Sequence, residues 1–284
     1  TKDFRERIDH YKQAYETMGL KDDLRYIKIF DVGRQIVANR INGFVPSRIV
    51  FYLNNLHIIP RPIYITRHGQ SEYNVLDKLG GDSALTPKGH EFAELLKEFM
   101  ISQDFDAETE LCVWSSTMRR AVQTAEIIPC AQYVRWKSME EINVRPTNQP
   151  TNQTLAAASL TRHRNELQVG VCDGLSYEEV ESRMPEEFAA RSRDKLRYRY
   201  PRGESYEDLI RRLDPVIIEL ERQRKPILIV AHRAVLRCLY AYFADENDRD
   251  QVPHVAIPLH TVIRLKPHAY GTSVERFKLM EGKD

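Results

Sequence analysis

From residue 62 onward, short apolar runs alternate along the chain with longer amphipathic segments. The apolar runs, at residues 63–66, 111–116, 133–136 and 226–232, are rich in β-branched and aromatic residues, as expected of strands. Strands joined through helices pair in parallel by right-handed crossovers, which leaves helices on both faces of the sheet. The alternation therefore predicts an α/β fold with three layers, α/β/α, and a mostly parallel central sheet.

Two prolines, Pro60 and Pro62, separate an N-terminal stretch from this alternating region. We therefore expect a main domain over residues 62–284 and an appended segment over residues 1–61. One stretch of the main domain breaks the alternation. Residues 144–168 contain the sequence PTNQ twice in tandem and are rich in Asn, Gln, Thr and Pro, a composition that predicts an inserted mobile loop.

The bulk composition excludes several classes of function. A formal net charge of +1, with 29% charged residues, argues against a general nucleic-acid or membrane partner. No apolar run approaches the roughly 20 residues that a membrane-spanning helix needs. The 4 cysteines are widely spaced and form no CxxC pair, which favours reduced thiols. We therefore expect a cytoplasmic protein.

Charged and titratable residues follow the predicted strands at the point where each strand ends. Arg67 and His68 follow the first strand, Arg120 follows the second, Glu141 the third, and His232 the last. Because sites in open parallel sheets lie outside the carboxyl ends of the strands, these side chains should converge on one edge of the sheet.

The converging residue types suit the handling of a phosphoryl group. Arginine matches phosphate oxygens with two parallel donors and stays charged. A neutral imidazole can attack phosphorus and carry the phosphoryl group, and a carboxylic acid can protonate the leaving oxygen. The sequence has no Walker loop and no HExxH motif. It therefore predicts phosphoryl transfer without a metal or another cofactor.

At these residues the sequence resembles the histidine phosphatase superfamily, whose fold is phosphoglycerate mutase-like. The stretch TRHGQSEYN, residues 66–74, resembles the signature of that superfamily. Residues 80–89, 170–222 and 258–271 resemble the bisphosphatase half of the bifunctional 6-phosphofructo-2-kinase/fructose-2,6-bisphosphatase family. Residues 26–61 resemble the last part of the kinase half. No GxxxxGK[ST] motif occurs in the sequence, so we expect no kinase activity from this chain.

The resemblance implies a reaction and a role for each matching residue. The reaction is hydrolysis of the 2-phosphate of fructose 2,6-bisphosphate to fructose 6-phosphate and phosphate, through a phosphohistidine at His68. Arg67, Arg120 and His232, with Asn74, would hold the phosphoryl group. The residues implied in binding the sugar and its 6-phosphate are Gly80, Tyr177, Arg191, Lys195, Tyr206 and Arg237.

The chain departs from the family at three points. Gln70 stands where the signature usually has Glu. Arg233 stands where the family usually has Gln, and it adds a positive charge to the predicted substrate site. The third departure concerns the catalytic acid, because residues 144–168 interrupt the family's spacing. If residue 143 is joined directly to residue 169, the family's catalytic acid corresponds to Glu141, and the strand before Glu141 also favours this assignment. If the acid is instead sought just before Gly170, it corresponds to Glu166.

Two other functions remain open from the sequence. A phosphoglycerate mutase or a broad sugar-phosphate phosphatase would share the core residues. A non-catalytic regulatory module that binds a sugar bisphosphate would share the pocket. The partners expected are a small-molecule substrate and a kinase domain, with a homodimer as one candidate assembly.

Overall fold

The computed structural model describes most of the chain in nine stretches. These are residues 2–19, 23–30, 35–55, 61–142, 172, 174–199, 203–244, 249–268 and 271–281. The chain divides into two compact units, Thr1–His57 and Ile58–Asp284, and each is described by itself. The predicted insertion at residues 144–168, with Glu166, lies outside the described residues.

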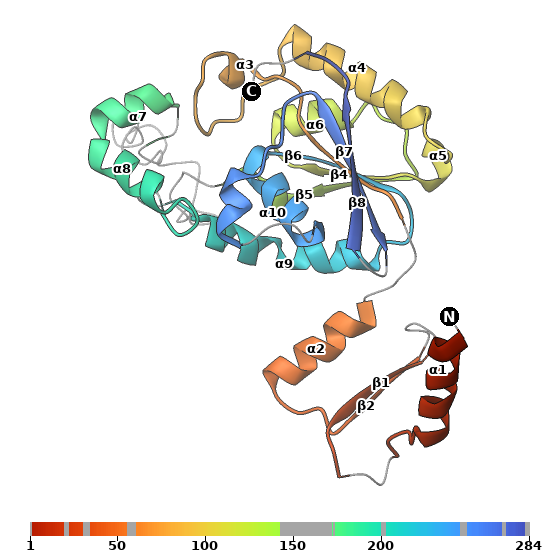
Figure 1. Ribbon diagram of the computed structural model, residues 1–284. Helices are drawn as coiled ribbons and strands as arrows, with labels where there is room; N and C mark the ends of the chain where they lie inside the picture. The colour runs from red at the N-terminus through yellow and green to blue at the C-terminus, as the bar shows by residue number, and fades with distance from the viewer. Residues whose placement is uncertain are drawn as a thin grey trace, which may run out of the picture. The chain divides into compact units, whose positions relative to one another are not determined.

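The first unit contains two helices and a two-stranded sheet. Its elements are α1 (Lys2–Ala14), β1 (Tyr26–Phe30), β2 (Gln35–Asn39) and α2 (Phe44–Asn55) (Figure 1). Strands β1 and β2 pair antiparallel, with Tyr26 opposite Asn39 and Phe30 opposite Gln35. Tyr26 is buried in this unit, and its hydroxyl donates to the carbonyl of Gly19 over 3.1 Å.

The second unit is built around a sheet of six strands in the order β5-β4-β6-β3-β7-β8. The strands are β3 (Ile63–Arg67), β4 (Cys112–Ser116), β5 (Gln132–Trp136), β6 (Ile227–Ala231), β7 (Thr261–His268) and β8 (Gly271–Lys278). Strands β5, β4, β6 and β3 pair in parallel, and β7 and β8 add an antiparallel hairpin at one side. The predicted mostly parallel sheet is therefore confirmed.

Helices cover both faces of this sheet, as Figure 1 shows. The helices and 3-10 turns are α3 (Glu72–Val75), α4 (Pro87–Ile101), α5 (Ala107–Glu110), α6 (Arg119–Ala125), η2 (Lys137–Met139), α7 (Tyr177–Arg183), α8 (Pro185–Arg193), α9 (Tyr206–Arg222), α10 (Arg233–Phe243) and η4 (Arg249–His254). Side chains of β6 alternate between the two faces. Ile227 and Ile229 pack with α9 and α10, whereas Leu228 and Val230 pack with α4 and α6. The three-layer architecture is confirmed.

Helices α7 and α8 stand beside the layered core rather than on a face of the sheet (Figure 1). They have a small apolar cluster of their own, in which Cys172 and Val180 are buried against Leu79 and Phe188. Helix α7 begins with a capping box, because Ser176 and Glu179 each accept a hydrogen bond from the other's backbone. No helix in the described part of the chain combines the length and the apolar character needed to cross a membrane.

Candidate active site

The strand β3 delivers Arg67 and His68 to the carboxyl edge of the sheet. The backbone N–H of His68 extends the ladder by donating to Ala231 of β6 over 3.1 Å. Parallel pairing of β3 with β6 puts Arg67 beside Ala231, so the residue after each strand, His68 and His232, meets the other. Their ring centroids lie 5.1 Å apart.

The hydrogen bonds of His68 identify its tautomer. Its Nδ1 lies 2.7 Å from the carbonyl oxygen of Gly69, which can only accept a hydrogen bond. Its Nε2 lies 3.0 Å from Nε of Arg120, which can only donate. The proton therefore resides on Nδ1, and the lone pair of Nε2 points toward the guanidinium of Arg120. A histidine in this state has a nucleophilic nitrogen beside a cation.

Glycine is required directly after His68 because helix α4 approaches the turn closely. A Cβ built on Gly69 would lie 2.4 Å from the carbonyl oxygen of Gly89, and a Cβ on Gly89 would lie 2.2 Å from that of Gln70. The backbone N–H of Gly69 also donates to Oγ1 of Thr124 in α6, over 3.0 Å. The residues 67–69, which we call the signature turn, are thus packed between α4 and α6.

The guanidinium of Arg120 is held from two sides. Nε donates to His68, and Nη1 donates to the carbonyl of Gly81 over 2.9 Å. The same loop supports the start of α6, since Oδ1 of Asp82 accepts from the backbone N–H of Arg119 over 2.7 Å. Sequence reasoning missed Asp82, because nothing in its local sequence indicates a contact with α6.

His232 is fully buried, and its Nε2 lies 2.9 Å from Oγ of Ser116 at the end of β4. Its Nδ1 is buried without a hydrogen-bond partner among the described residues. The hydroxyl of Ser116 also accepts from the backbone N–H of Met118 over 3.2 Å. Ser116 is a second residue that the sequence did not identify, although it ends a predicted strand as Arg67 does.

Both histidines are neutral around neutral pH. Burial lowers the pKa of His68 well below its usual value, and the nearby Arg120 and Arg67 lower it further. Burial also lowers the pKa of His232 strongly, with Arg120 as the next cause. Because protonation would add positive charge to a buried cationic site, the nucleophilic form of His68 is favoured.

The predicted acid Glu141 lies half-buried after η2, where its Oε1 accepts from the backbone N–H of Ile142 over 3.0 Å. Burial raises the pKa of Tyr206 and of Cys238 to about 12 each, and the charge of Glu141 contributes to both shifts. Glu141 therefore faces α9 and α10. The carboxylate of the neighbouring Glu140 instead accepts a hydrogen bond from Oγ1 of Thr117.

A group of cations gathers between α8 and α10. Burial lowers the pKa of Lys195 to about 8, and Arg237, Arg191 and Arg233 contribute in that order. Arg237 is fixed by two hydrogen bonds, from Nη1 to the hydroxyl of Tyr206 over 3.0 Å and from Nε to the carbonyl of Val255 over 2.7 Å. Five of the predicted substrate-binding residues thus share one region.

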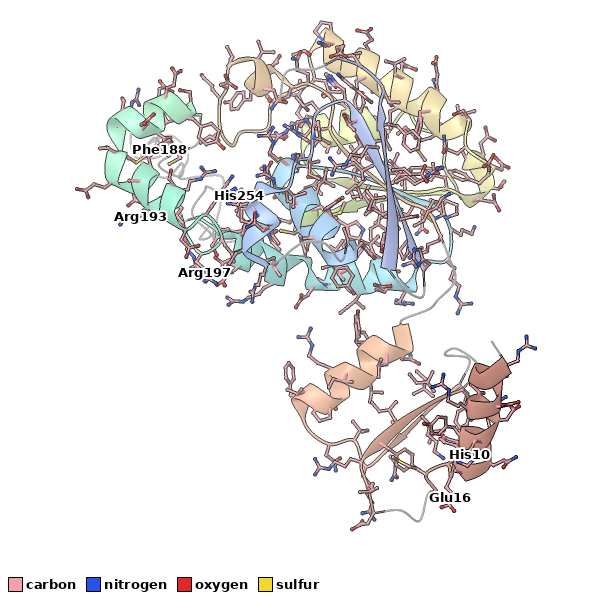
Figure 2. All side chains as sticks on the ribbon, in the orientation of Figure 1. His10, Glu16, Phe188, Arg193, Arg197 and His254 are labelled. Atoms are coloured by element: carbon pink, nitrogen blue, oxygen red, sulfur yellow. The ribbon has the colours of Figure 1, made fainter. Side chains whose placement is uncertain are left out.

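Tyr177 and Arg191 belong to the same side of this region, since the guanidinium of Arg191 lies 5.3 Å from the ring centroid of Tyr177. His254 is an additional member that the sequence did not identify. Burial lowers the pKa of His254, and Lys195 and Arg237 lower it further. Figure 2 shows His254 on η4, on the side toward α8.

The remaining two predicted residues lie in the segment between the signature turn and Asp82. Asn74 serves the capping box of α3, in which its Oδ1 accepts from the backbone N–H of Ser71 over 3.0 Å. Gly80 has a φ of 72°, in the left-handed region that glycine tolerates. Among the described residues, no group of three or more His, Cys, Asp or Glu side chains is arranged to hold a metal ion.

Two sequence profiles match the chain. The profile of the histidine phosphatase superfamily (branch 1) matches residues 63–165 and 147–279. The profile of 6-phosphofructo-2-kinase matches residues 1–60. The first match includes the turn with His68 and the strand that leads to His232.

Two bifunctional relatives are similar to this chain over nearly its whole length. A 6-phosphofructo-2-kinase/fructose-2,6-bisphosphatase from Gallus gallus is 46% identical over 275 residues, 96% of this chain and 52% of the relative. 6-Phosphofructo-2-kinase/fructose-2,6-bisphosphatase 4 from Homo sapiens is 46% identical over 277 residues, 97% of this chain and 52% of the relative. The chain therefore spans about half the length of these relatives.

Solved structures share the fold at lower identity. The alpha-ribazole phosphatase from Shigella flexneri has a TM-score of 0.59 and 18% identity, covering 78% of this chain and 99% of that chain. A mycobacterial glucosyl-3-phosphoglycerate phosphatase with VO3 has a TM-score of 0.55 and 21% identity, covering 76% and 97%. At these identities the likeness supports the fold alone, and the predicted phosphoglycerate mutase-like fold class is confirmed.

Proposed function

Because the chain belongs to the histidine phosphatase superfamily (branch 1), we propose that it transfers a phosphoryl group from a sugar phosphate to His68 and then to water. The substrate is fructose 2,6-bisphosphate, and the products are fructose 6-phosphate and phosphate. The observation that carries the reaction class is the neutral His68, whose Nε2 accepts a hydrogen bond from Nε of Arg120 over 3.0 Å. The printed names of the relatives support the substrate.

The first chemical step forms a bond between Nε2 of His68 and the phosphorus of the 2-phosphate. The bond between phosphorus and the sugar oxygen breaks, and that oxygen takes a proton from Glu141. Arg67, Arg120 and His232 meet the charge of the transferred group, with Asn74 as a further donor. Arg120 exchanges its hydrogen bond with Nε2 for one with a phosphoryl oxygen, which frees the lone pair for attack.

The second step returns His68 to its starting state. Water attacks the phosphorus, its proton passes to the Glu141 carboxylate, and the bond between phosphorus and Nε2 breaks. The same carboxyl group thus acts first as an acid and then as a base. The hydrogen bond from Nδ1–H to Gly69 holds the ring in place, and it favours the positive charge that the ring carries as phosphohistidine.

The second phosphate of the substrate would lie among the cations around Lys195. Three arginines surround this lysine, and Tyr206 adds a hydroxyl that is hydrogen-bonded to one of them. Such a group binds an anion and a polyhydroxylated ring together. Tyr177, Gly80 and Arg191 complete the proposed sugar site.

We further propose that residues 1–61 form the C-terminal part of a kinase-like domain and that a kinase domain is the partner of the phosphatase domain. The profile match over residues 1–60 supports this division. We also propose a cytoplasmic location. The four cysteines are free thiols, three of them buried and Cys130 half-buried, which suits a reducing compartment.

The test is incubation with fructose 2,6-bisphosphate labelled at the 2-phosphate, followed by an alkaline quench that preserves phosphohistidine. We expect label on His68 and release of fructose 6-phosphate, and we expect neither in His68→Ala. Persistent phosphoenzyme in that variant would contradict the assignment of the nucleophile. Binding without label or product would favour a regulatory module, and label from 2,3-bisphosphoglycerate instead would favour a mutase.

A further inference from the structure

The loop of residues 138–141 carries the proposed acid, and a side chain from helix α9 holds this loop. We propose that Arg212 of α9 is a positioning residue for Glu141, and that Glu204 keeps Arg212 in place. The inference rests on the proposed function, in which Glu141 protonates the leaving oxygen. Arg212 does not touch the reacting atoms, because its guanidinium contacts the backbone of the loop.

Both terminal nitrogens of Arg212 bind this loop. Nη1 donates to the carbonyls of Ser138 and Glu140 over 3.0 and 3.2 Å. Nη2 donates to the carbonyls of Glu140 and Glu141 over 3.2 and 3.5 Å, and to Oε2 of Glu204 over 2.9 Å. The guanidinium therefore holds three backbone carbonyls within the span of four residues that ends at Glu141.

The position of the Glu141 carboxylate depends on the backbone of the loop. Its Oε1 accepts from the backbone N–H of Ile142, the residue that follows it. Before it, Met139 anchors η2 in the core with a fully buried side chain. Between that anchor and the acid, Thr117 donates to the carboxylate of Glu140, and Arg212 supplies the contact from α9.

Arginine is suited to this role for a geometric reason. Its donors are arranged in a rigid planar fork that can satisfy several carbonyls at once, whereas lysine presents three donors from a single nitrogen. Glu204 holds the fork in one orientation. The side chains of Arg212 and Glu204 are 23% and 14% exposed, so water competes little for these bonds.

Arg212, held by Glu204, acts as a clamp on three backbone carbonyls within residues 138–141. Loss of this clamp should lower the rate of the chemical step more than it lowers substrate affinity. Displacing a catalytic group by about 1 Å can lower a rate about 100-fold. The cations proposed to bind the substrate lie outside the loop that Arg212 holds: they come from β3, α6, α8 and α10, with Lys195 just after α8. Substrate affinity should therefore survive when the acid is misplaced.

The experiment compares Arg212→Lys and Glu204→Gln with Arg211→Lys. Arg211 is the matched control, because it lies on the same helix with a 72% exposed side chain and pairs with Asp208. For Arg212→Lys we expect kcat to fall about 10- to 100-fold with KM within about threefold of the parent. Glu204→Gln should show a smaller loss in kcat, and Arg211→Lys should match the parent. An unchanged kcat in both clamp variants overturns the proposal.

A leaving-group comparison separates positioning from general loss of structure. p-Nitrophenolate leaves without needing a proton, so the burst of p-nitrophenolate from p-nitrophenyl phosphate should keep its rate in Arg212→Lys. Its amplitude should not fall, because Glu141 also assists the second step and a slower second step lets more phosphoenzyme accumulate. The burst also shows that His68 remains competent, whether or not fructose 2,6-bisphosphate is the substrate. A burst that slows as much as sugar-phosphate turnover contradicts the proposal. The melting temperature of Arg212→Lys shows whether the variant is folded.

A double-mutant cycle tests whether Arg212 acts through Glu141. If it does, Arg212→Lys should cause no further loss of kcat in a Glu141→Gln background. The full loss in that background would mean that the clamp serves another group, and it overturns the inference. Failure of the parent protein to turn over fructose 2,6-bisphosphate would instead count against the proposed function.

Discussion

Lys195 is a titrating residue in the proposed sugar-phosphate site. Burial and three neighbouring arginines lower its pKa to about 8, so in the free protein its positive charge is present below that pH and is lost above it. A phosphate dianion binds the charged form more tightly, and its presence raises the pKa of Lys195 again. Affinity for a sugar bisphosphate should therefore be constant at lower pH and should weaken as the pH rises through 8.

The measurement is KM for fructose 2,6-bisphosphate from about pH 7 to about pH 9.5. Above pH 8, KM should rise more and more steeply, and its slope should approach a factor of about ten for each pH unit. Lys195→Arg keeps the charge over this range and should remove most of the rise. A KM that stays flat in the parent protein, or that rises equally in Lys195→Arg, would contradict this prediction.

Arg233 adds a charge beside Lys195, at the first position of α10 and directly after His232. We expect Arg233→Gln to weaken both substrate and fructose 6-phosphate by about tenfold, the effect of losing one charge-assisted hydrogen bond. Because product release becomes faster, kcat should stay equal or rise. Inhibition constants for fructose 6-phosphate measure the effect, with Arg211→Gln as the exposed control. Tighter product binding in Arg233→Gln would show that the prediction is wrong.

Helix α4 and the signature turn approach each other closely at two glycines, Gly69 and Gly89. Gly89 lies in the first turn of α4, where alanine usually stabilises a helix by about 0.5–1 kcal/mol relative to glycine. Here the added Cβ would lie 2.2 Å from the backbone oxygen of Gln70, which a small shift cannot relieve. The steric cost therefore exceeds the gain in helix propensity.

Gly89→Ala should accordingly lower the free energy of unfolding by about 2–3 kcal/mol, as overpacking of a close contact does. Gly174→Ala is the matched control. Gly174 has a φ of 78° but nothing within 4 Å of its Cβ position, so only backbone strain of about 1–2 kcal/mol is expected. Urea unfolding of the two variants gives the comparison. A stability gain in Gly89→Ala would mean that the helix end moves away at little cost.

The site residues that could be predicted from the sequence are those marked by their position at the end of a predicted strand. Arg67, His68 and His232 could be placed together because each follows a buried parallel strand, and a parallel sheet aligns those ends. Asp82 and Arg212 could not be found in this way, since neither stands at the end of a strand and their contacts reach segments far away in the chain. Ser116 does end a strand, but a serine at that place does not by itself indicate a role in the site.

Similar reasons explain other gaps in the prediction. The β7–β8 hairpin adds antiparallel strands to the sheet, and an alternation of strands and helices does not indicate them. The charge at His254 is coupled to Lys195 and Arg237 only because η4 packs beside α10. The choice between Glu141 and Glu166 stays a prediction, because Glu166 lies outside the described residues.

Across the whole chain, burial is distributed unevenly between the two compact units. Strand β6, in the larger unit, is fully buried along its length, with residues from both apolar clusters on its two faces. In the smaller unit, every described side chain of α1 from residue 5 onward is exposed. Large apolar side chains of α2 are exposed as well, including Phe44 at 75% and Val45 at 63%.

Amide hydrogen exchange of this chain should follow the same division. An isolated helix of the 13 residues in α1 is marginal in water, because nucleation is costly and packing supplies most helical stability. We therefore expect amides of α1 to exchange with protection of at most about tenfold, whereas those of β6 should open only with global unfolding. Exchange followed by mass spectrometry on peptides from the intact chain measures both. Strong protection of α1 would mean that a second molecule or another part of the chain covers its surface, and repeating the exchange at lower protein concentration would separate these two cases.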